Sequence, residues 1–319
     1  MTKHLISLAV ALALTASVSA QEQAAPSPGE IVAEAPAADW VEIAGDDLLV
    51  TTLGPDAQGN AREVVIQLIP VPFSQGWVEN IRTLARAGWY DDITVNRVQD
   101  NYVVQWGDPN YDNPEADGEA KPLPDALRKM SEKDYTSPVT SIRNREMPAE
   151  GNSGAKGDAY AAWTDFYKGW PIASDGKRDW LVHCYGMVGV GRGMSPDTGT
   201  GADLYTVIGH APRHLDRNIA LVGRIVAGME HLSSLPRGSG ALGFYTAEES
   251  GKRTPILSVR VASDLPASEQ PAFEYLSTEG ETFARYAEAR ANRRDPFFIA
   301  PAGGADICNI PVPVRRAAR

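Results

Sequence analysis

Short apolar runs separated by turn residues recur along most of the chain. Runs rich in Val, Ile, Leu and Thr and bounded by Gly, Pro, Asn or Asp are typical of β-strands. They predict strands over residues 48–52, 63–69, 94–106 (in two pieces), 181–190, 204–208, 219–226 and 256–261. Apolar residues at helical spacing predict helices over residues 77–87, 227–235 and 280–293. Many short strands and few helices indicate a mainly β protein, a barrel or a sandwich.

The first 20 residues have the pattern of a secretory signal peptide. Lys3 precedes an apolar run over residues 5–14, and small residues lead to a cleavage site after Ala20. An uncleaved membrane anchor is the alternative. We expect a periplasmic or secreted protein that does not insert into the membrane after cleavage. Residues 21–38 hold almost no large apolar side chains and predict a disordered linker.

The remaining chain divides by composition. The predicted β-domain spans residues 39–262, and a polar stretch rich in Pro, Gly, Asn and Asp indicates an insertion over about residues 109–180. Residues 263–319 form a C-terminal extension with one amphipathic helix, expected to pack on the domain. We expect the insertion and the extension to form additional surface structure rather than part of the core.

Charge and motifs exclude several function classes. A net charge of −11 argues against a nucleic-acid partner, since phosphate binding requires a basic surface. The Gly-x-Gly-x-x-Gly run over residues 238–243 matches a dinucleotide motif, but no long helix follows it, which favours a glycine-rich turn. His210 and His214 have the spacing of zinc ligands on a helix, but Pro212 lies between them. We therefore predict neither a metal nor a cofactor.

The chain has two cysteines, Cys184 and Cys308. An even count in an oxidising compartment permits one disulfide, which would tie the C-terminal extension to the domain. Two buried free thiols remain the alternative, because the sequence cannot decide between them.

Residues 95–108 read Val-Asn-Arg-Val-Gln-Asp-Asn-Tyr-Val-Val-Gln-Trp-Gly-Asp. This segment resembles the signature of the cyclophilin-type peptidyl-prolyl cis-trans isomerases, in which a His-Arg strand leads through a turn to an aromatic residue, an apolar residue and Gln-x-Gly-Asp. The resemblance covers about residues 46–262. It implies a closed, eight-stranded antiparallel β-barrel capped by two helices. The matching positions are Arg97, Tyr102, Val103, Gln105, Gly107 and Asp108.

The second half of the resemblance is less complete. It implies that Gly191 lies along the substrate backbone, that Tyr205 is the pocket aromatic, and that His214 and Leu215 occupy the positions of the family's Trp-Leu pair. From residue type alone, Gly191 is equally compatible with a bulge and Tyr205 with a core aromatic. Ile219 stands where the family has a pocket histidine.

The residues themselves suggest a mechanism. Arg97 lies in an apolar alternating strand, where it is either a salt-bridged surface residue or one wall of a pocket shared with Gln105 and Tyr102. A fixed guanidinium can donate to the prolyl nitrogen only when the amide is twisted, which lowers the barrier. Gln105 would hold Arg97, while Tyr102 and Val103 would seat the proline ring.

The function expected from the sequence is therefore isomerisation of X-Pro bonds in exported proteins. Arg97 and Gln105 are the catalytic candidates. The candidates for substrate binding are Tyr102, Val103, Gly191, Tyr205, His214 and Leu215. Expected partners are proline-containing polypeptides, and the protein is expected to be monomeric. The alternative is a catalytically weak or inactive proline-peptide binding module of the cell envelope, and a third hypothesis, a glycan-binding β-domain, rests on seven scattered tryptophans.

Overall fold

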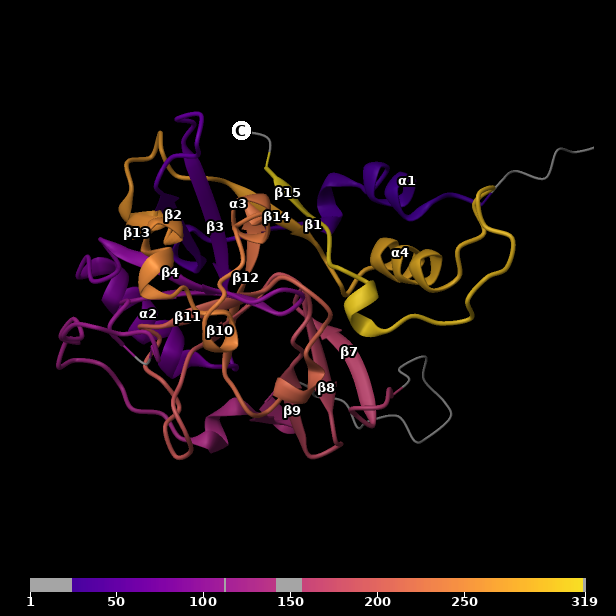
Figure 1. The fold of residues 1–319 in the computed structure, drawn as a ribbon. Coiled ribbons are helices and arrows are strands. Elements are labelled where there is room, and N and C mark those ends of the chain that lie inside the picture. Colours follow the sequence, from indigo (N-terminus) through magenta and orange to yellow (C-terminus); the bar gives the residue numbers. More distant parts are fainter. Residues whose placement is uncertain (1–24, 112, 142–156, 318–319) are drawn as a thin grey trace, which may run out of the picture.

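The centre of the molecule is a closed β-barrel in which every neighbouring pair of strands is antiparallel (Figure 1). The computed structural model describes residues 25–111, 113–141 and 157–317. Around the barrel the strands are β10 (Met187–Val190), β11 (Leu204–Val207), β5 (Val103–Gly107), β4 (Ile93–Val98), β13 (Pro255–Val261), β2 (Leu48–Leu53), β3 (Arg62–Leu68) and β12 (Leu221–Ala227). The predicted eight-stranded barrel is confirmed, and most of its strands lie within a few residues of the predicted positions. The strand predicted over residues 181–190 is shorter and begins at Met187.

Local chemistry explains the first hairpin. The carboxylate of Asp56 accepts hydrogen bonds from the backbone N–H groups of Gln58 and Asn60, at 2.9 and 2.8 Å. Gly59 follows in the left-handed region, at a φ of 83°, which glycine adopts without steric cost. This turn brings β2 and β3 into register along their whole length.

Two helices pack onto the barrel. Helix α2 (Gln75–Arg86) buries one apolar face that includes Trp77, Ile81 and Leu84, as its helical spacing predicts. Helix α3 (Met229–Ser233) follows β12 and buries Leu232. All four side chains belong to the main hydrophobic core, so both predicted helices contribute to the barrel's interior packing.

The insertion contributes to the core, contrary to our expectation of surface structure alone. It carries most of a four-stranded sheet in the order β6 (Ser137–Pro138), β9 (Arg178–Leu181), β8 (Trp170–Ser174) and β7 (Trp163–Tyr167). Trp170 and Trp180 are fully buried and join the same core as the barrel strands. Two large aromatic side chains bury enough apolar area to fix this sheet against the barrel.

The predicted disordered linker over residues 21–38 is wrong from Pro28 onward. Helix α1 (Pro28–Ala33) begins with a capping box, in which Ser27 accepts from the backbone of Glu30 and Glu30 accepts from the backbone of Ser27. Ile31 is buried against the C-terminal extension, which supplies the apolar contacts that the local composition lacks. The expected signal peptide lies in residues 1–20, outside the described residues.

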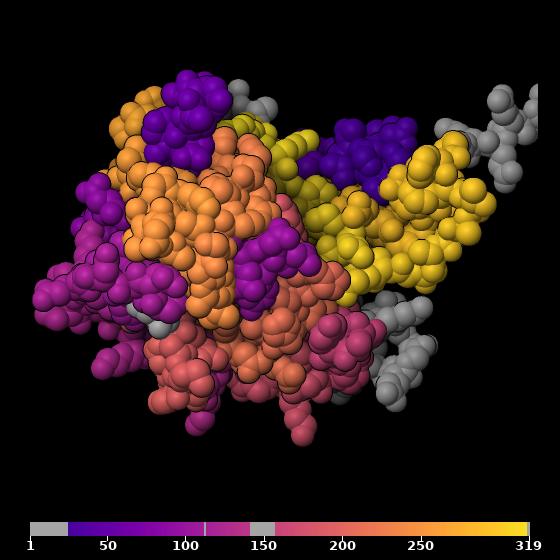
Figure 2. Space-filling model, viewed as in Figure 1, coloured from indigo at the N-terminus to yellow at the C-terminus, as the bar shows by residue number. Residues whose placement is uncertain are grey.

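The C-terminal extension pairs with the N-terminal segment. A three-stranded sheet has the order β1 (Trp40–Glu42), β14 (Phe273–Leu276) and β15 (Val314–Arg316), and helix α4 (Glu281–Ala291) lies beside α1 (Figure 1). The space-filling view shows α1, in indigo, against the yellow C-terminal extension on one flank of the molecule (Figure 2). A disulfide joins Cys184, just before β10, to Cys308 in the extension. No helix in the described part of the chain is long and apolar enough to span a membrane.

Short 3-10 turns link these elements. They span Ala37–Asp39, Gly45–Asp47, Glu132–Tyr135, Val139–Ser141, Arg213–Leu215, Ala241–Gly243, Ala247–Lys252, Ala262–Asp264 and Ile307–Asn309.

Candidate active site

One row of residues crosses four neighbouring barrel strands. Arg97 on β4 lies opposite Gln105 on β5, Gln105 lies opposite Tyr205 on β11, and Tyr205 lies opposite Gly189 on β10. A bulge at Asn96 shifts the register of β4 just before Arg97. Bulges of this kind re-aim a side chain, and the row places the predicted catalytic pair next to the predicted pocket aromatic.

Hydrogen bonds hold the guanidinium of Arg97 on three sides. Its Nη1 donates to Oε1 of Gln105 at 3.0 Å, its Nε donates to the backbone oxygen of Leu242 at 2.7 Å, and its Nη2 donates to Gln99. A guanidinium has five N–H donors. Two of them have no hydrogen-bond partner among the described residues and remain for a ligand.

Two aromatic rings flank the same guanidinium. The Cζ atom of Arg97 lies 5.5 Å from the ring centroid of Tyr102 and 5.5 Å from that of Phe244. Both distances fall within the range of cation–π attraction. Burial lowers the pKa of Arg97, but an arginine side chain stays protonated at neutral pH. The result is a fixed cation with aromatic neighbours on one side of a pocket.

A buried carboxylate fixes the orientation of Gln105. The Nε2 atom of Gln105 donates to Oδ2 of Asp203 at 2.6 Å, and the Asp203 residue is 4% exposed. Because a carboxylate can only accept, the amide nitrogen of Gln105 must face it. The amide oxygen is then left facing Arg97, which is the arrangement needed to hold a guanidinium.

These residues line a pocket of about 790 Å³. The predicted residues that line it are Arg97, Tyr102, Val103, Gln105, Gly191, Tyr205 and Leu215. His214 does not line it. Its ring stacks on that of Tyr102, with centroids 6.4 Å apart and an angle of 10° between the planes. Ile219 also lines the pocket.

Several pocket residues were not found from the sequence. Asn110, Asn113 and Met194 belong to loops, Leu242 lies in the glycine-rich turn at residues 238–243, and Phe244 follows it directly. Residues 241–243 form a short 3-10 turn rather than the start of a long helix, and the backbone oxygen of Leu242 accepts a hydrogen bond from Arg97. Loop residues of this kind leave no periodic signal in the sequence.

Asp203 was missed for a different reason. It is a single carboxylate in an otherwise apolar strand region, Ala-Asp-Leu-Tyr-Thr, and a buried carboxylate requires a hydrogen-bonding partner. The isolated carboxylate was visible in the sequence, but its hydrogen-bonding partner, Gln105, could not be identified there. The described residues include no group of three or more His, Cys, Asp and Glu side chains placed to hold a metal ion.

Comparisons with known proteins agree with this fold. Residues 76–261 match the family model described as cyclophilin type peptidyl-prolyl cis-trans isomerase/CLD. The crystal structure of the cyclophilin AquaCyp293 from Hirschia baltica has a TM-score of 0.60 at 20% sequence identity, covering 88% of this chain and 95% of that chain. It supports the fold.

A cyclophilin type peptidyl-prolyl cis-trans isomerase from Cryptosporidium parvum, solved in the presence of the dipeptide Ala-Pro, has a TM-score of 0.36 at 12% identity and covers 66% of this chain and 98% of that chain. No curated protein sequence matches the chain. Since the family model spans more than half of the sequence and the barrel has the expected form, the chain belongs to the cyclophilin-type peptidyl-prolyl cis-trans isomerases.

Proposed function

We propose that this protein isomerises X-Pro bonds of exported proteins and that Arg97 supplies the transition-state contact. The observation that carries the proposal is the fixed guanidinium of Arg97, with two N–H groups that have no partner among the described residues, at the edge of a pocket with largely apolar walls. A donor that is already oriented needs no reorganisation when the substrate amide twists.

The chemistry needs little more than this contact. Rotation about the X-Pro bond breaks amide resonance, which raises a barrier of about 18–20 kcal/mol. In the twisted state the prolyl nitrogen regains a lone pair and can accept a hydrogen bond from Arg97. The planar ground state offers no such acceptor, so the contact stabilises the transition state selectively. Gln105, oriented by Asp203, keeps the guanidinium in place.

The remaining pocket residues would hold the substrate. Tyr102, Val103, Tyr205 and Leu215 offer aromatic and aliphatic surface for the pyrrolidine ring. Gly191 leaves room for the substrate backbone to approach the barrel. The substrates implied by this pocket are proline-containing polypeptides, and we propose that the protein binds them as a monomer.

An exported location rests on two observations. The sequence begins with the pattern of a signal peptide, and the structure contains a disulfide between Cys184 and Cys308. Disulfides persist in oxidising compartments and are rare in the cytosol. Fractionation of cells that produce the tagged full-length chain tests this proposal. Recovery of uncleaved, reduced protein from the cytosol alone would contradict it.

Replacement of Arg97 tests the mechanism. We expect Arg97→Ala to lower kcat/KM on an Ala-Pro peptide by roughly 100-fold to 1000-fold, the range for loss of one oriented transition-state donor. NMR exchange or a protease-coupled assay measures the rate. Arg237→Ala removes an exposed arginine paired with Asp100 and serves as the matched control. Equal rates for the wild type and Arg97→Ala would rule the mechanism out.

A proline-peptide binding module is the second candidate. The apolar Ile219 favours it, because it replaces a polar pocket group of the family. In that case the protein would bind Pro-containing peptides tightly, and the cis and trans peptide signals would show no accelerated exchange. Binding and exchange can be measured in the same NMR titration, which separates the two candidates directly.

A further inference from the structure

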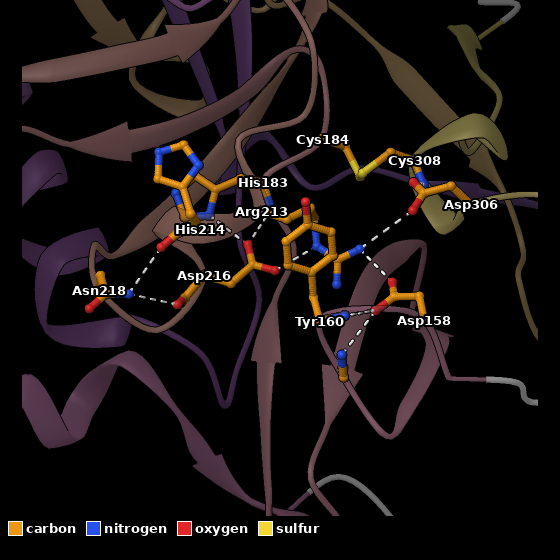
Figure 3. A network of polar contacts seen from close by, with 11 residues as sticks. Asp158, Tyr160, His183, Cys184, Arg213, His214, Asp216, Asn218, Asp306 and Cys308 are labelled. Atoms are coloured by element: carbon orange, nitrogen blue, oxygen red, sulfur yellow. Dashed lines mark hydrogen bonds and ion pairs between the residues drawn. A yellow bond between two sulfur atoms is a disulfide. The ribbon is translucent and has the colours of Figure 1, made fainter.

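His183 lies behind the pocket and uses both of its ring nitrogens. The side chain is fully buried. Its Nδ1 lies 2.9 Å from Oδ1 of Asp216, and its Nε2 lies 2.8 Å from the hydroxyl oxygen of Tyr205 (Figure 3 shows His183 and Asp216). The rings of His183 and Tyr205 are nearly parallel, with centroids 6.3 Å apart. His183 itself does not line the pocket, but Tyr205 does.

The partners determine the tautomer of His183. A carboxylate can only accept a hydrogen bond, so Nδ1 carries the proton and donates to Asp216. In the neutral ring Nε2 is then an acceptor, and the hydroxyl of Tyr205 must donate to it. Burial lowers the pKa of His183, which favours this neutral form. The hydroxyl proton of Tyr205 therefore points away from the substrate pocket.

Asp216 is held in turn by a buried arginine. The Nε atom of Arg213 donates to Oδ2 of Asp216 at 2.7 Å, and its Nη1 lies 2.6 Å from Asp158 of the insertion and 3.6 Å from Asp306 of the C-terminal extension (Figure 3). The backbone N–H of His183 also donates to Asp216, at 3.0 Å. Segments that are distant in the sequence thus meet directly behind the pocket wall.

The ring of Tyr205 is also confined across the barrel. Gly189 faces it in the strand register, and a Cβ atom at that position would overlap the hydroxyl end of the ring. Tyr205 therefore fits only because residue 189 has no side chain. The hydrogen bond from its hydroxyl to His183 and the close packing against Gly189 together restrict the orientation of the Tyr205 ring.

We propose that His183 is a positioning residue for the isomerase reaction: with Asp216 it forms an anchor that fixes Tyr205 as a rigid apolar wall of the proline pocket. This rests on the proposed function of the pocket. Because the hydroxyl proton is engaged by His183, Tyr205 presents its ring rather than a donor to the substrate. The anchor thereby favours the pyrrolidine ring over polar side chains.

A double-mutant cycle tests the anchor. His183→Asn keeps a donor near Asp216 but is too short to reach Tyr205, and Tyr205→Phe removes only the hydroxyl. We expect each to lower kcat/KM by about tenfold, the effect of one buried hydrogen bond, and the double variant to be no worse than either. His183→Gln, which can still reach Tyr205, should recover part of the rate. The proposal would be overturned if the losses of kcat/KM in the two single variants multiplied in the double variant. It would also be overturned if Tyr205→Phe kept the full rate while His183→Asn lost activity.

Matched controls separate positioning from stability. Tyr286→Phe removes a hydroxyl bonded to the backbone of Pro311 at 2.7 Å, and His231→Asn changes a histidine outside the pocket. Both should leave kcat/KM unchanged. Thermal unfolding of all variants shows whether a rate loss follows a stability loss. If the loss of kcat/KM across the variants followed only the loss of melting temperature, His183 would have a structural role in the core and no positioning role.

A measurement on the wild type covers the case in which the variants do not fold. Nitrogen-15 NMR at neutral pH should show His183 protonated at Nδ1 only, because burial lowers its pKa even though Asp216, Arg213, His214 and Tyr205 surround it. Protonation at Nε2, or titration near pH 6.5, would overturn the anchor. This readout does not depend on activity. If Arg97→Ala keeps the wild-type rate, the proposed mechanism fails, while the tautomer still reports on the anchor.

Discussion

The amide of Gln105 donates to the carboxylate of Asp203 at 2.6 Å, and the two residues lie 98 positions apart in the sequence. Gln105 is thereby oriented before any substrate arrives, with its oxygen toward Arg97. The pocket thus depends on a residue that does not line it. A buried carboxylate acts on the active site through one hydrogen bond.

Asp203→Asn tests this dependence. An asparagine can present either an oxygen or an N–H to Gln105, so the orientation of the Gln105 amide is no longer fixed. We expect kcat/KM to fall by about tenfold while the fold is retained, in line with one charge-assisted hydrogen bond. The peptide exchange assay measures this. Asp264→Asn, which removes an exposed carboxylate paired with Arg86, should be silent.

Gly191→Ala should disturb the same carboxylate. A Cβ atom at residue 191 would lie 2.6 Å from Oδ2 of Asp203, which is too close for two nonbonded atoms. We expect a loss of about 1–3 kcal/mol in the free energy of unfolding, typical of overpacking, together with a lower rate. Gly251→Ala is the control, because no atom lies within 4 Å of a Cβ there. Wild-type stability and rate in Gly191→Ala would show that Asp203 can move away at little cost.

The free energy of unfolding should decrease as the pH falls, because of His183. Burial lowers its pKa in the folded state, an effect that outweighs the opposing hydrogen bond to Asp216. In the unfolded chain the pKa is about 6.5, so the unfolded state binds the proton more readily. The folded state is therefore most stable above about pH 6.5, where His183 is neutral in both states, and it loses stability as the pH falls below that value.

Urea unfolding between pH 8 and pH 5 measures this dependence. A single group contributes a slope of at most about 1.4 kcal/mol per pH unit. The slope should be shallower in His183→Gln than in the wild type, because the variant lacks the group whose pKa burial lowers. Equal slopes in the wild type and His183→Gln would contradict the prediction.

Removal of the disulfide should release the C-terminal extension. Cys184 and Cys308 close a loop with a sequence separation of 124, and cross-links of this kind contribute about 2–4 kcal/mol. We expect the Cys184→Ser, Cys308→Ser double variant to unfold at a lower temperature and to lose the extension first to limited proteolysis. Reductant should lower the melting temperature of the wild type and leave that of the double variant unchanged. Identical melting curves with and without the bridge would show that packing alone holds the extension.

Local features of this protein could be predicted from its amino-acid sequence alone. Alternating apolar residues and turn chemistry predicted the barrel strands and helix α2, because these patterns reflect contacts between near neighbours. Arg97, Tyr102 and Gln105 were recognisable for the same reason: they lie on one hairpin, so their spacing in the sequence already specifies their spacing in space.

The residues packed behind that hairpin became identifiable only in the folded structure. Asp203, His183 and Leu242 reach the site from distant segments, and each meets its partner only when the barrel closes. Order in α1 and the burial of Trp170 likewise come from distant contacts, since apolar burial depends on what a segment packs against. The sequence identified the catalytic candidates, and the closed barrel supplied the residues that hold them in place.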